Sequence, residues 1–218
     1  ISKTVNEYIL ENYKNHLKTE PRLIYRGSDQ DYFTKQFQVT EQYRENFFSQ
    51  FPKLVNKEII AFPGRLSSWK GQESFIKLIS SLPDNYSGLI VGPYEDAKKK
   101  YYKKLQNLIR DYNLENRVFF YNAKDDIREI YSLSALVMNL SSTPEPFGRT
   151  LLEAAMMGKK ICGWNRGGVG EVLKLFYEEG QVEFNDFEQL TEKTKSIITS
   201  SNKPKEVFLT SELMHQKT

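Results

Sequence analysis

The chain has 218 residues, of which 39% are hydrophobic and 27% are charged, and its formal net charge is +3. This composition is typical of a folded protein with a sizeable core, and it argues against a strongly basic nucleic-acid-binding protein. No apolar run approaches the roughly 20 residues that cross a bilayer. A single cysteine, Cys162, excludes an intramolecular disulfide and fits a reducing compartment. We therefore expect a cytoplasmic protein, with contact to the inner face of the membrane as an alternative.

The first 56 residues are predicted to be connecting structure. The expected elements are an amphipathic helix at Ser2–Tyr13, a short strand at Arg22–Arg26, a turn at Arg26–Asp29 and a helix at about 40–51. Because the first residue is Ile1, we expect residues 1–56 to contain the end of a preceding domain and a linker. Residues 57–200 then form the main domain, and residues 201–218 form an exit segment that is cut short.

Residues 57–200 alternate short apolar runs with longer amphipathic segments. Strands are expected at Glu58–Phe62, Gly88–Val91, Arg117–Tyr121, Ala135–Leu140, Lys160–Trp164 and Gln181–Phe184. Helices are expected near 71–81, 96–112, 125–132, 149–158, 168–176 and 186–200. This alternation predicts an α/β fold, a Rossmann-like parallel sheet with helices on both faces. Ligands of such sheets bind at the carboxyl ends of the strands.

The densest polar motif, residues 141–154, follows the strand expected to end at Leu140. Its Phe147-Gly148-Arg149-Thr150 segment opens a helix whose first N–H groups lack intrahelical partners, which favours an anion such as a diphosphate. Glu145 lies before this helix and Glu153 about one turn inside it. Because a carboxylate accepts hydrogen bonds from neighbouring sugar hydroxyls, we expect one to hold a ribose and the other a transferred sugar. The alternative is a capping glutamate and an exposed glutamate.

Two further motifs follow predicted strands. In residues 63–71, Arg65 and Lys70 would neutralise a diphosphate and stabilise its charge as it departs, although alone they would indicate a solvated surface. Residues 166–171 contain three glycines, Gly167, Gly168 and Gly170. They either satisfy the backbone geometry of a turn or allow close contact with a donor sugar.

In order and spacing, these motifs resemble those of the large retaining GT-B family often called glycosyl transferases group 1. The resemblance covers about residues 58–175, and Glu145 and Glu153 match the Glu-x7-Glu pattern of that family. The other matching segments are Gly64-Arg65 with Lys70-Gly71, Arg117–Phe120, and Gly167-Gly168 with Glu171. Ser2–Tyr13 and Arg26–Phe33 resemble the last helix and the interdomain linker that precede this domain in the family.

The resemblance implies a role for each motif. Arg65 and Lys70 would bind the diphosphate, Glu145 the hydroxyls of the donor sugar, and Glu153 the ribose. The remaining donor-binding residues would be Gly64, the backbone of Phe147, Gly148, Arg149 and Thr150, and a base-binding loop of Asn122, Ala123 and Lys124. Asn122 stands where the family usually has glycine.

The resemblance also implies an activity. A hexose-type sugar would pass from a nucleotide diphosphate sugar, such as a UDP- or GDP-sugar, to a saccharide or glycolipid acceptor with retention of configuration. No separate cofactor is expected. The acceptor platform would lie in an N-terminal domain outside this chain, so the chain alone is expected to be inactive. The family's frequent roles suggest cell-envelope polysaccharide biosynthesis. Two alternatives stay open, a non-catalytic nucleotide-binding module and a sugar-phosphate-dependent phosphorylase.

Other candidate groups are set aside. Asp29-Gln30-Asp31 matches a metal-binding pattern of another glycosyltransferase fold, but it lies in the expected linker, so no metal is expected. His16 and His215 lie outside every motif. The lysines between Lys98 and Lys104 predict a solvated helix face, with an anionic membrane or acceptor surface as the alternative. Cys162 is expected to be a small core residue rather than a nucleophile.

Overall fold

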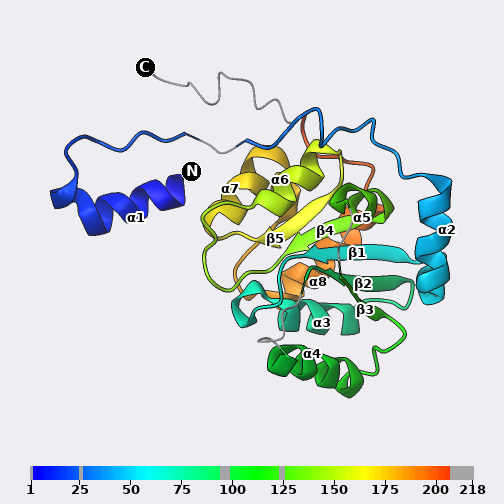
Figure 1. The fold of residues 1–218 in the computed structure, drawn as a ribbon. Helices are drawn as coiled ribbons and strands as arrows, with labels where there is room; N and C mark the ends of the chain where they lie inside the picture. The colour runs from blue at the N-terminus through cyan, green and yellow to red at the C-terminus, as the bar shows by residue number, and fades with distance from the viewer. Residues whose placement is uncertain (1, 25–26, 94–98, 123–125, 207–218) are drawn as a thin grey trace.

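The computed structural model describes residues 2–24, 27–93, 99–122 and 126–206 (Figure 1). The strands are β1 (Glu58–Pro63), β2 (Tyr86–Val91), β3 (Val118–Tyr121), β4 (Leu136–Asn139), β5 (Ile161–Trp164) and β6 (Gln181–Val182). The α-helices are α1 (Lys3–Tyr13), α2 (Glu41–Gln50), α3 (Gln72–Ser80), α4 (Lys99–Asp111), α5 (Ile127–Leu133), α6 (Arg149–Met156), α7 (Gly167–Phe176) and α8 (Phe187–Thr199). Short 3-10 turns lie at Lys14–His16, Pro52–Leu54, Ser68–Lys70 and Glu178–Gly180.

The strands form one parallel sheet in the order β3-β2-β1-β4-β5-β6. The chain moves outward from β1 to β3, then crosses to the other side of β1 and moves outward again to β6. Ile60 marks this centre, because it pairs with Gly88 of β2 and with Leu136 of β4. The prediction of a Rossmann-like parallel sheet is confirmed. The order of the strands reverses between β1 and β4, and open sheets bind their ligands at the carboxyl ends beside such a reversal.

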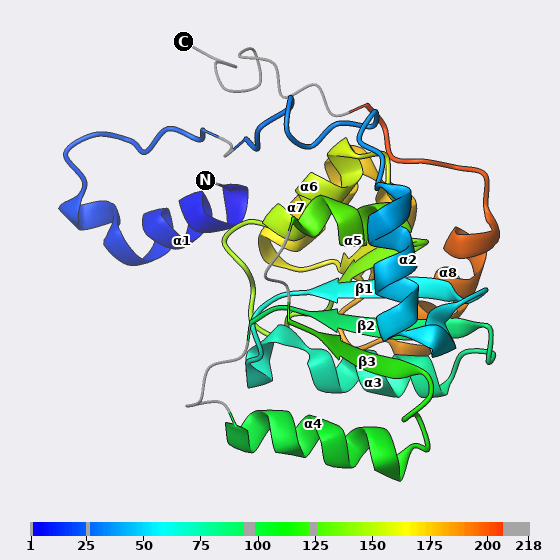
Figure 2. The ribbon, with the colours of Figure 1, turned by 45° about the vertical axis from the view of Figure 1, so that its right-hand side comes forward.

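Helices cover both faces of the sheet. Helices α3, α4 and α8 lie together on one face, and α6 and α7 pack against β4 and β5 on the other (Figures 1 and 2). At the outer strand β3, the ring of Phe51 in the segment after α2 packs on Phe119, whereas Tyr102 of α4 packs on Phe120. Since successive side chains of a strand point to opposite faces, α2 and α4 cover the two sides of β3.

The strands are largely apolar because most of their residues are buried on both faces of the sheet. Every residue of β2 is buried, and β1 is buried from Ile59 to Pro63. At the amino end of β3, the guanidinium of Arg117 donates to the carbonyl oxygens of Leu82, Pro83 and Tyr86. Arg117, which belongs to one of the family-like motifs, therefore holds the turn into β2 and lies at the edge of the sheet opposite to the carboxyl ends.

Several predicted elements need correction. Residues 22–24 of the expected strand Arg22–Arg26 are not in a strand, and Ile24 is exposed. These residues lie outside the six-stranded sheet, whose edge strands are β3 and β6. Tyr25 and Arg26 lie outside the described residues. The turn expected at Arg26–Asp29 instead lies at 30–32, where the N–H of Phe33 donates to the carbonyl of Asp29. The last strand contains only Gln181–Val182.

The segments outside the sheet divide into two kinds. Phe33, Phe47, Phe51 and Leu54, all ahead of β1, are buried in the main core. Helix α1, in contrast, has no buried residue and stands away from the sheet, with only its N-terminal end close to α7 (Figure 1). Within the described ranges, no helix has the length and apolar character needed to span a membrane.

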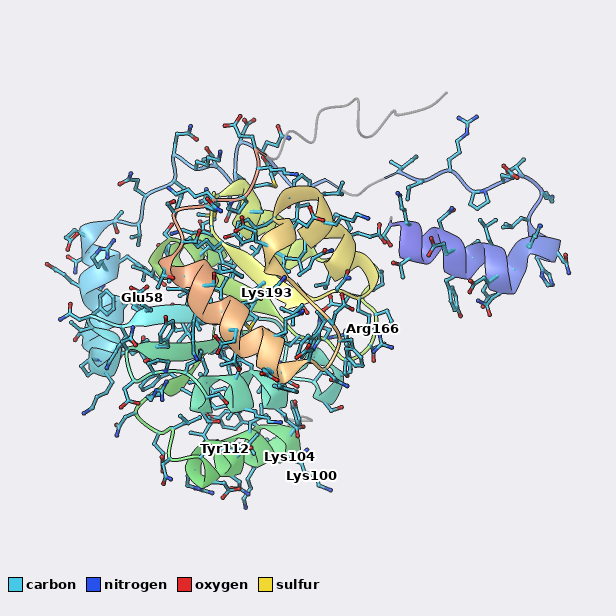
Figure 3. The ribbon with its side chains drawn as sticks, turned by 180° about the vertical axis from the view of Figure 1, so that it is seen from behind. Glu58, Lys100, Lys104, Tyr112, Arg166 and Lys193 are labelled. Atoms are coloured by element: carbon cyan, nitrogen blue, oxygen red, sulfur yellow. The ribbon has the colours of Figure 1, made fainter. Side chains whose placement is uncertain are left out.

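The lysine-rich helix face is exposed as predicted. Lys100 and Lys104 of α4 are exposed (Figure 3), and Lys104 forms an ion pair with Glu73 of α3 at 2.6 Å. Leu105 and Ile109 form the buried side of the same helix. Lys98 lies outside the described residues.

Gly71 holds the end of β4 against the loop that follows β1. Its φ is +91°, and a Cβ atom on it would lie 2.0 Å from the carbonyl oxygen of Leu140. We expect Gly71→Ala to lower the free energy of unfolding by about 3 kcal/mol, from left-handed backbone strain plus steric overlap. Urea unfolding measures this change.

The matched control is Gly158→Ala. Gly158 has a φ of +71°, but its Cβ would meet only the flexible side chain of Lys35, at 3.4 Å. The loss should therefore be about 1 kcal/mol, from backbone strain alone. Equal losses in both variants would contradict the proposed overlap with Leu140.

Candidate active site

Three loops meet at the carboxyl edge of the sheet, beside the point where the strand order reverses. They are the β1–α3 loop (64–71), the β4–α6 loop (140–148) and the β5–α7 loop (165–166). The backbone N–H of Ser142 donates to the carbonyl of Trp69 at 2.8 Å, which joins the first two loops. The guanidinium of Arg166 donates to the carbonyl of Ser142 at 2.6 Å, which joins the third. The predicted motifs are thus brought together in one place.

Glu145 is held by three side chains. Its Oε1 accepts hydrogen bonds from Lys70 Nζ at 2.8 Å, from Asn139 Nδ2 at 2.9 Å and from the hydroxyl of Ser141. Asn139 also accepts a hydrogen bond from the backbone N–H of Ser141 at 3.0 Å, so the three residues form one network. Within the described part of the chain, all of the hydrogen bonds to the Glu145 carboxylate end on Oε1. The other carboxylate oxygen is therefore the one available to a ligand.

Asn139 and Ser141 contact Glu145, and neither was among the site residues predicted from the sequence. Both are buried, and Asn139 is the last residue of β4. A polar side chain at the end of an otherwise apolar strand was the available signal, because buried polar groups need partners. Their role is to orient the carboxylate of Glu145.

The predicted cations Arg65 and Lys70 occupy different environments. Lys70 is half-buried, and its Nζ lies 2.8 Å from Glu145 and 4.5 Å from the centre of the Trp69 ring. Since an ammonium has three donors, this ion pair leaves donors for a phosphate. Arg65 is exposed at the surface of the same loop. The backbone N–H of Gly64 donates to the carbonyl of Val91 at 2.8 Å, so Gly64 extends the pairing of β1 with β2.

Gln72 supports the loop that carries both cations. It is fully buried, and its side-chain amide donates to the carbonyl of Arg65 at 3.1 Å. The hydroxyl of Tyr101 in α4 donates to the other end of the same amide at 3.3 Å. This support joins α4 to the β1–α3 loop, and no sequence motif indicated it.

The N-terminus of α6 is suited to an anion. Gly148 precedes the helix without a side-chain cap, and the first turn contains no acidic residue. Among the described residues, the buried hydroxyl of Thr150 has no hydrogen-bond partner. Phe147 is half-buried and Arg149 is exposed. The first N–H groups of a helix carry partial positive charge, and this end lies beside Glu145 and Lys70 at the reversal point.

Glu153 is a buried carboxylate within α6. Its Oε1 lies 3.0 Å from Nε of Arg149, and its Oε2 accepts a longer bond of 3.4 Å from the hydroxyl of Tyr131. Burial raises the pKa of the Glu153 carboxyl, and the guanidinium of Arg149 opposes that shift. Burial of the Tyr131 hydroxyl, together with the nearby charge of Glu153, raises the pKa of Tyr131 well above its ordinary value. Glu153 is thus a carboxylate whose hydrogen-bonding capacity is only partly used.

The glycines that begin α7 pack the loops together. The backbone N–H of Gly168 donates to the carbonyl of Glu145 at 2.8 Å. A Cβ on Gly168 would lie 2.5 Å from Cα of Phe147, and one on Gly148 would lie 3.1 Å from Cα of Val169. Of the two interpretations of the glycine motif, these contacts favour backbone packing. The backbone at Gly148 lies close to the backbone of α7.

The other candidate residues in the described part of the chain do not join the network around Glu145. Asn122 is exposed directly after β3, whereas Ala123 and Lys124 lie outside the described residues. The Asp29 carboxylate accepts the backbone N–H groups of Asp31 and Tyr32 and so caps a turn. Among the described residues, no cluster of three potential metal ligands is present. His16 is exposed in the turn after α1, and His215 lies outside the described part. Cys162 is fully buried, and burial raises the pKa of its thiol to about 12.

A basic cavity of about 410 Å³ lies at the opposite, amino edge of the sheet. Its basic lining residues are Lys35, Arg44, Lys159, Lys160 and Lys203. Lys159 donates to the carbonyl of Ser132 at the end of α5, and Lys160 donates to those of Ile198 and Ser200 at the end of α8. These lysines neutralise the negative ends of helices, a structural role that needs no ligand.

The reversed strand order and the loops at its carboxyl edge define a class, the Rossmann-like C-terminal half of the GT-B glycosyltransferases. The chain belongs to the family described as glycosyl transferases group 1, which matches residues 43–208. This match confirms the resemblance inferred from the motifs.

Individual proteins show the same likeness. An uncharacterised glycosyltransferase of Methanocaldococcus jannaschii, MJ1069, is 29% identical over 93% of this chain and 49% of its own length. A glycosyltransferase of Rickettsia africae superposes with a TM-score of 0.81 at 28% identity, over 91% of this chain and 52% of its own. HepE of Anabaena, in complex with UDP-glucose, gives a TM-score of 0.71 at 26% identity, over 82% and 48%. The chain thus spans about half the length of the relatives it matches.

The raised pKa of Glu153 predicts a pH-dependent stability. Between pH 4.5, the ordinary pKa of glutamate, and the raised pKa, the Glu153 carboxyl binds more protons in the folded protein than in the unfolded chain. Stability should therefore fall as pH rises through the window between 4.5 and the raised pKa. Glu153→Gln removes this charge, so its unfolding free energy should improve relative to the parent protein as pH rises from 4.5 to neutrality.

Urea unfolding across this pH range measures the difference between the two proteins. Glu178→Gln, at an exposed glutamate in the turn after α7, is the control and should show no such trend. A stability difference for Glu153→Gln that does not depend on pH would contradict the assignment.

Proposed function

We propose that this chain is the donor-binding half of a retaining glycosyltransferase that transfers a hexose-type sugar from a nucleotide diphosphate sugar. The observation that carries the proposal is the position of Glu145. Lys70, Asn139 and Ser141 hold one of its carboxylate oxygens, and the N-terminus of α6 lies beside it. A UDP-sugar is the favoured donor, because the Anabaena relative was crystallised with UDP-glucose.

Each group has a task in the proposed reaction. Arg65, Lys70 and the first N–H groups of α6 bind the diphosphate and stabilise the charge that develops on it. The free oxygen of Glu145 accepts hydrogen bonds from hydroxyls of the donor sugar, and Glu153 accepts them from the ribose. The base lies by the loop that begins at Asn122 and includes Ala123 and Lys124.

The chemistry is a displacement at the anomeric carbon on one face of the sugar. The bond from that carbon to the diphosphate oxygen breaks, and a bond to the acceptor oxygen forms on the same face, with retention. The acceptor hydroxyl gives its proton to the departing diphosphate. Cationic side chains and helix N–H groups supply the positive charge for this departure, so the proposed reaction requires no metal.

The acceptor is proposed to be a saccharide or a glycolipid held by a second domain. The length of the relatives, about twice the matched part, supports that arrangement. We place the reaction in the cytoplasm, at or near the inner face of the membrane, in the synthesis of a cell-envelope polysaccharide. The family's frequent roles are the basis of this placement.

Calorimetric titration of this chain with UDP and with UDP-glucose tests the donor proposal. Glu153→Ala should weaken the binding of UDP by about 1 to 3 kcal/mol, the scale of a lost hydrogen bond to a charged group. Glu145→Ala should leave the affinity for UDP nearly unchanged and weaken the binding of UDP-glucose. Equal losses for UDP in both variants would remove the assignment of the two glutamates.

Two further variants belong to the same titration. Arg65→Ala combined with Lys70→Ala should weaken the binding of both UDP and UDP-glucose, because the diphosphate is common to the two ligands. Glu178→Ala, an exposed glutamate away from the loops, should bind as the parent protein does. Binding of glucose 1-phosphate in preference to UDP-glucose would favour the phosphorylase alternative instead.

Transfer should need the rest of the protein. Donor and acceptor must be held together with water excluded, and this chain supplies groups for the donor only. We expect the isolated chain to bind UDP-glucose without transferring glucose to an acceptor, whereas a full-length form does. The transfer rates of the two forms are compared with the same radiolabelled donor and the same acceptor. Similar rates would show that the chain is sufficient, and binding without transfer by the full-length form would favour a non-catalytic module.

A further inference from the structure

The first turn of α1 is bound to Glu171, a residue of α7. The Glu171 carboxylate accepts the backbone N–H groups of Lys3 and Thr4, each at 2.8 Å, and the hydroxyl of Thr4 at 2.7 Å. We call these three residues the α1 clasp. Glu171 is the last residue of the glycine motif in the sequence, and none of the motif roles explained it.

The clasp completes the hydrogen bonding of the helix end. The hydroxyl of Ser2 accepts the N–H of Val5 at 3.2 Å, and the carbonyl of Ser2 accepts the N–H of Asn6 at 3.1 Å. Ser2 thus caps its own helix but does not reach the N–H groups of Lys3 and Thr4. Those two groups are satisfied by Glu171, whose negative charge also suits the positive end of a helix.

Among the described residues, little else holds α1 in place. Ser2 is fully buried, but no residue of Lys3–Tyr13 is buried, and Tyr8 and Tyr13 are 56% and 50% exposed. The helix extends away from the sheet beyond its first turn (Figures 1 and 3). A helix of 11 residues is marginal by itself in water. Its position and its helicity in this chain therefore depend on the clasp.

The clasp lies close to the candidate active site. Gly168, one turn before Glu171 in α7, binds the carbonyl of Glu145. Helix α7 therefore holds both the Glu145 loop and the start of α1. Between these two parts lies a hollow of about 500 Å³. Its lining consists of Thr4, Val5, Glu7, Tyr8 and Glu11 on one side and Pro144, Glu145 and Pro146 on the other.

We infer that Glu171 is a positioning residue that fixes α1 and thereby the width of the hollow beside Glu145. It acts on the side of Glu145 that faces α1 and takes no part in binding the nucleotide. The clasp itself stands on the contacts of this chain alone. Only its effect on the binding of the donor sugar rests on the proposed function.

Hydrogen–deuterium exchange of this chain tests the clasp directly. In Glu171→Ala, amides in the first turns of α1 should lose protection by at least about tenfold, the scale of lost hydrogen bonds to a charged group. Exchange in β1 and β2 should stay as in the parent protein. Glu171→Gln should restore part of the protection, because its amide oxygen still accepts. Glu178→Ala, which removes an exposed carboxylate outside the clasp, should change nothing.

Unchanged exchange of α1 in Glu171→Ala would overturn the clasp. Loss of protection throughout the sheet in both Glu171 variants would also overturn it, since Glu171 would then be a general stabiliser. This result is independent of whether the chain binds UDP. If the parent protein fails to bind UDP, the proposed function fails while the exchange result still decides the clasp.

The effect on the site is measured by titration with UDP and with UDP-glucose. Glu171→Ala should retain the UDP affinity of the parent chain and weaken the binding of UDP-glucose several-fold, because Glu145, the residue proposed to bind the donor sugar, lines the hollow. Glu171→Gln should recover part of the affinity for UDP-glucose. An unchanged affinity for UDP-glucose, or an equal loss of affinity for UDP, would overturn the positioning role.

Discussion

The parallel direction of all six strands is the constraint on which the rest of the structure depends. Because every strand runs the same way, the connecting helices begin near one edge of the sheet and end near the other. The amino edge collects helix C-termini, and Lys159 and Lys160 donate to their carbonyl oxygens. The carboxyl edge collects helix N-termini, and carboxylates gather there. Glu145 lies beside α6 and α7, and Glu171 binds the start of α1. The helix dipoles thus favour opposite charges at the two edges.

Burying a carboxylate costs solvation free energy, and the buried carboxylates at the carboxyl edge have different partners that offset this cost. A single carboxylate oxygen of Glu145 accepts hydrogen bonds from an ammonium, an amide and a hydroxyl. Glu153 has one guanidinium and a long bond from Tyr131, and burial raises its pKa. A group that is incompletely satisfied in the free protein gains most from a polar ligand. The two glutamates therefore differ in what they can still accept, although they stand in one motif.

Helix α7 connects the parts of the site. Its first turn holds the backbone of Glu145, and its second holds α1 through Glu171. Close packing between Gly168 and Phe147 leaves no room for a side chain at the junction. A shift of α7 would consequently move both walls of the hollow beside Glu145. The glycine motif is thus explained by packing between loops, with the carboxylate at its end reaching a separate helix.

Local sequence patterns predicted the sheet, its helices and the motifs at its carboxyl edge. Strands that are buried on both faces are largely apolar, so Glu58–Phe62 and Gly88–Val91 were recognisable, and the residues after them were expected at the ligand-binding edge. Tertiary structure alone decided which atoms meet. The pairing of Lys70 with Glu145 and the binding of Lys3 and Thr4 by Glu171 join residues far apart in the chain. Such contacts depend on strand order and on the placement of loops, and no periodicity of a single segment encodes them.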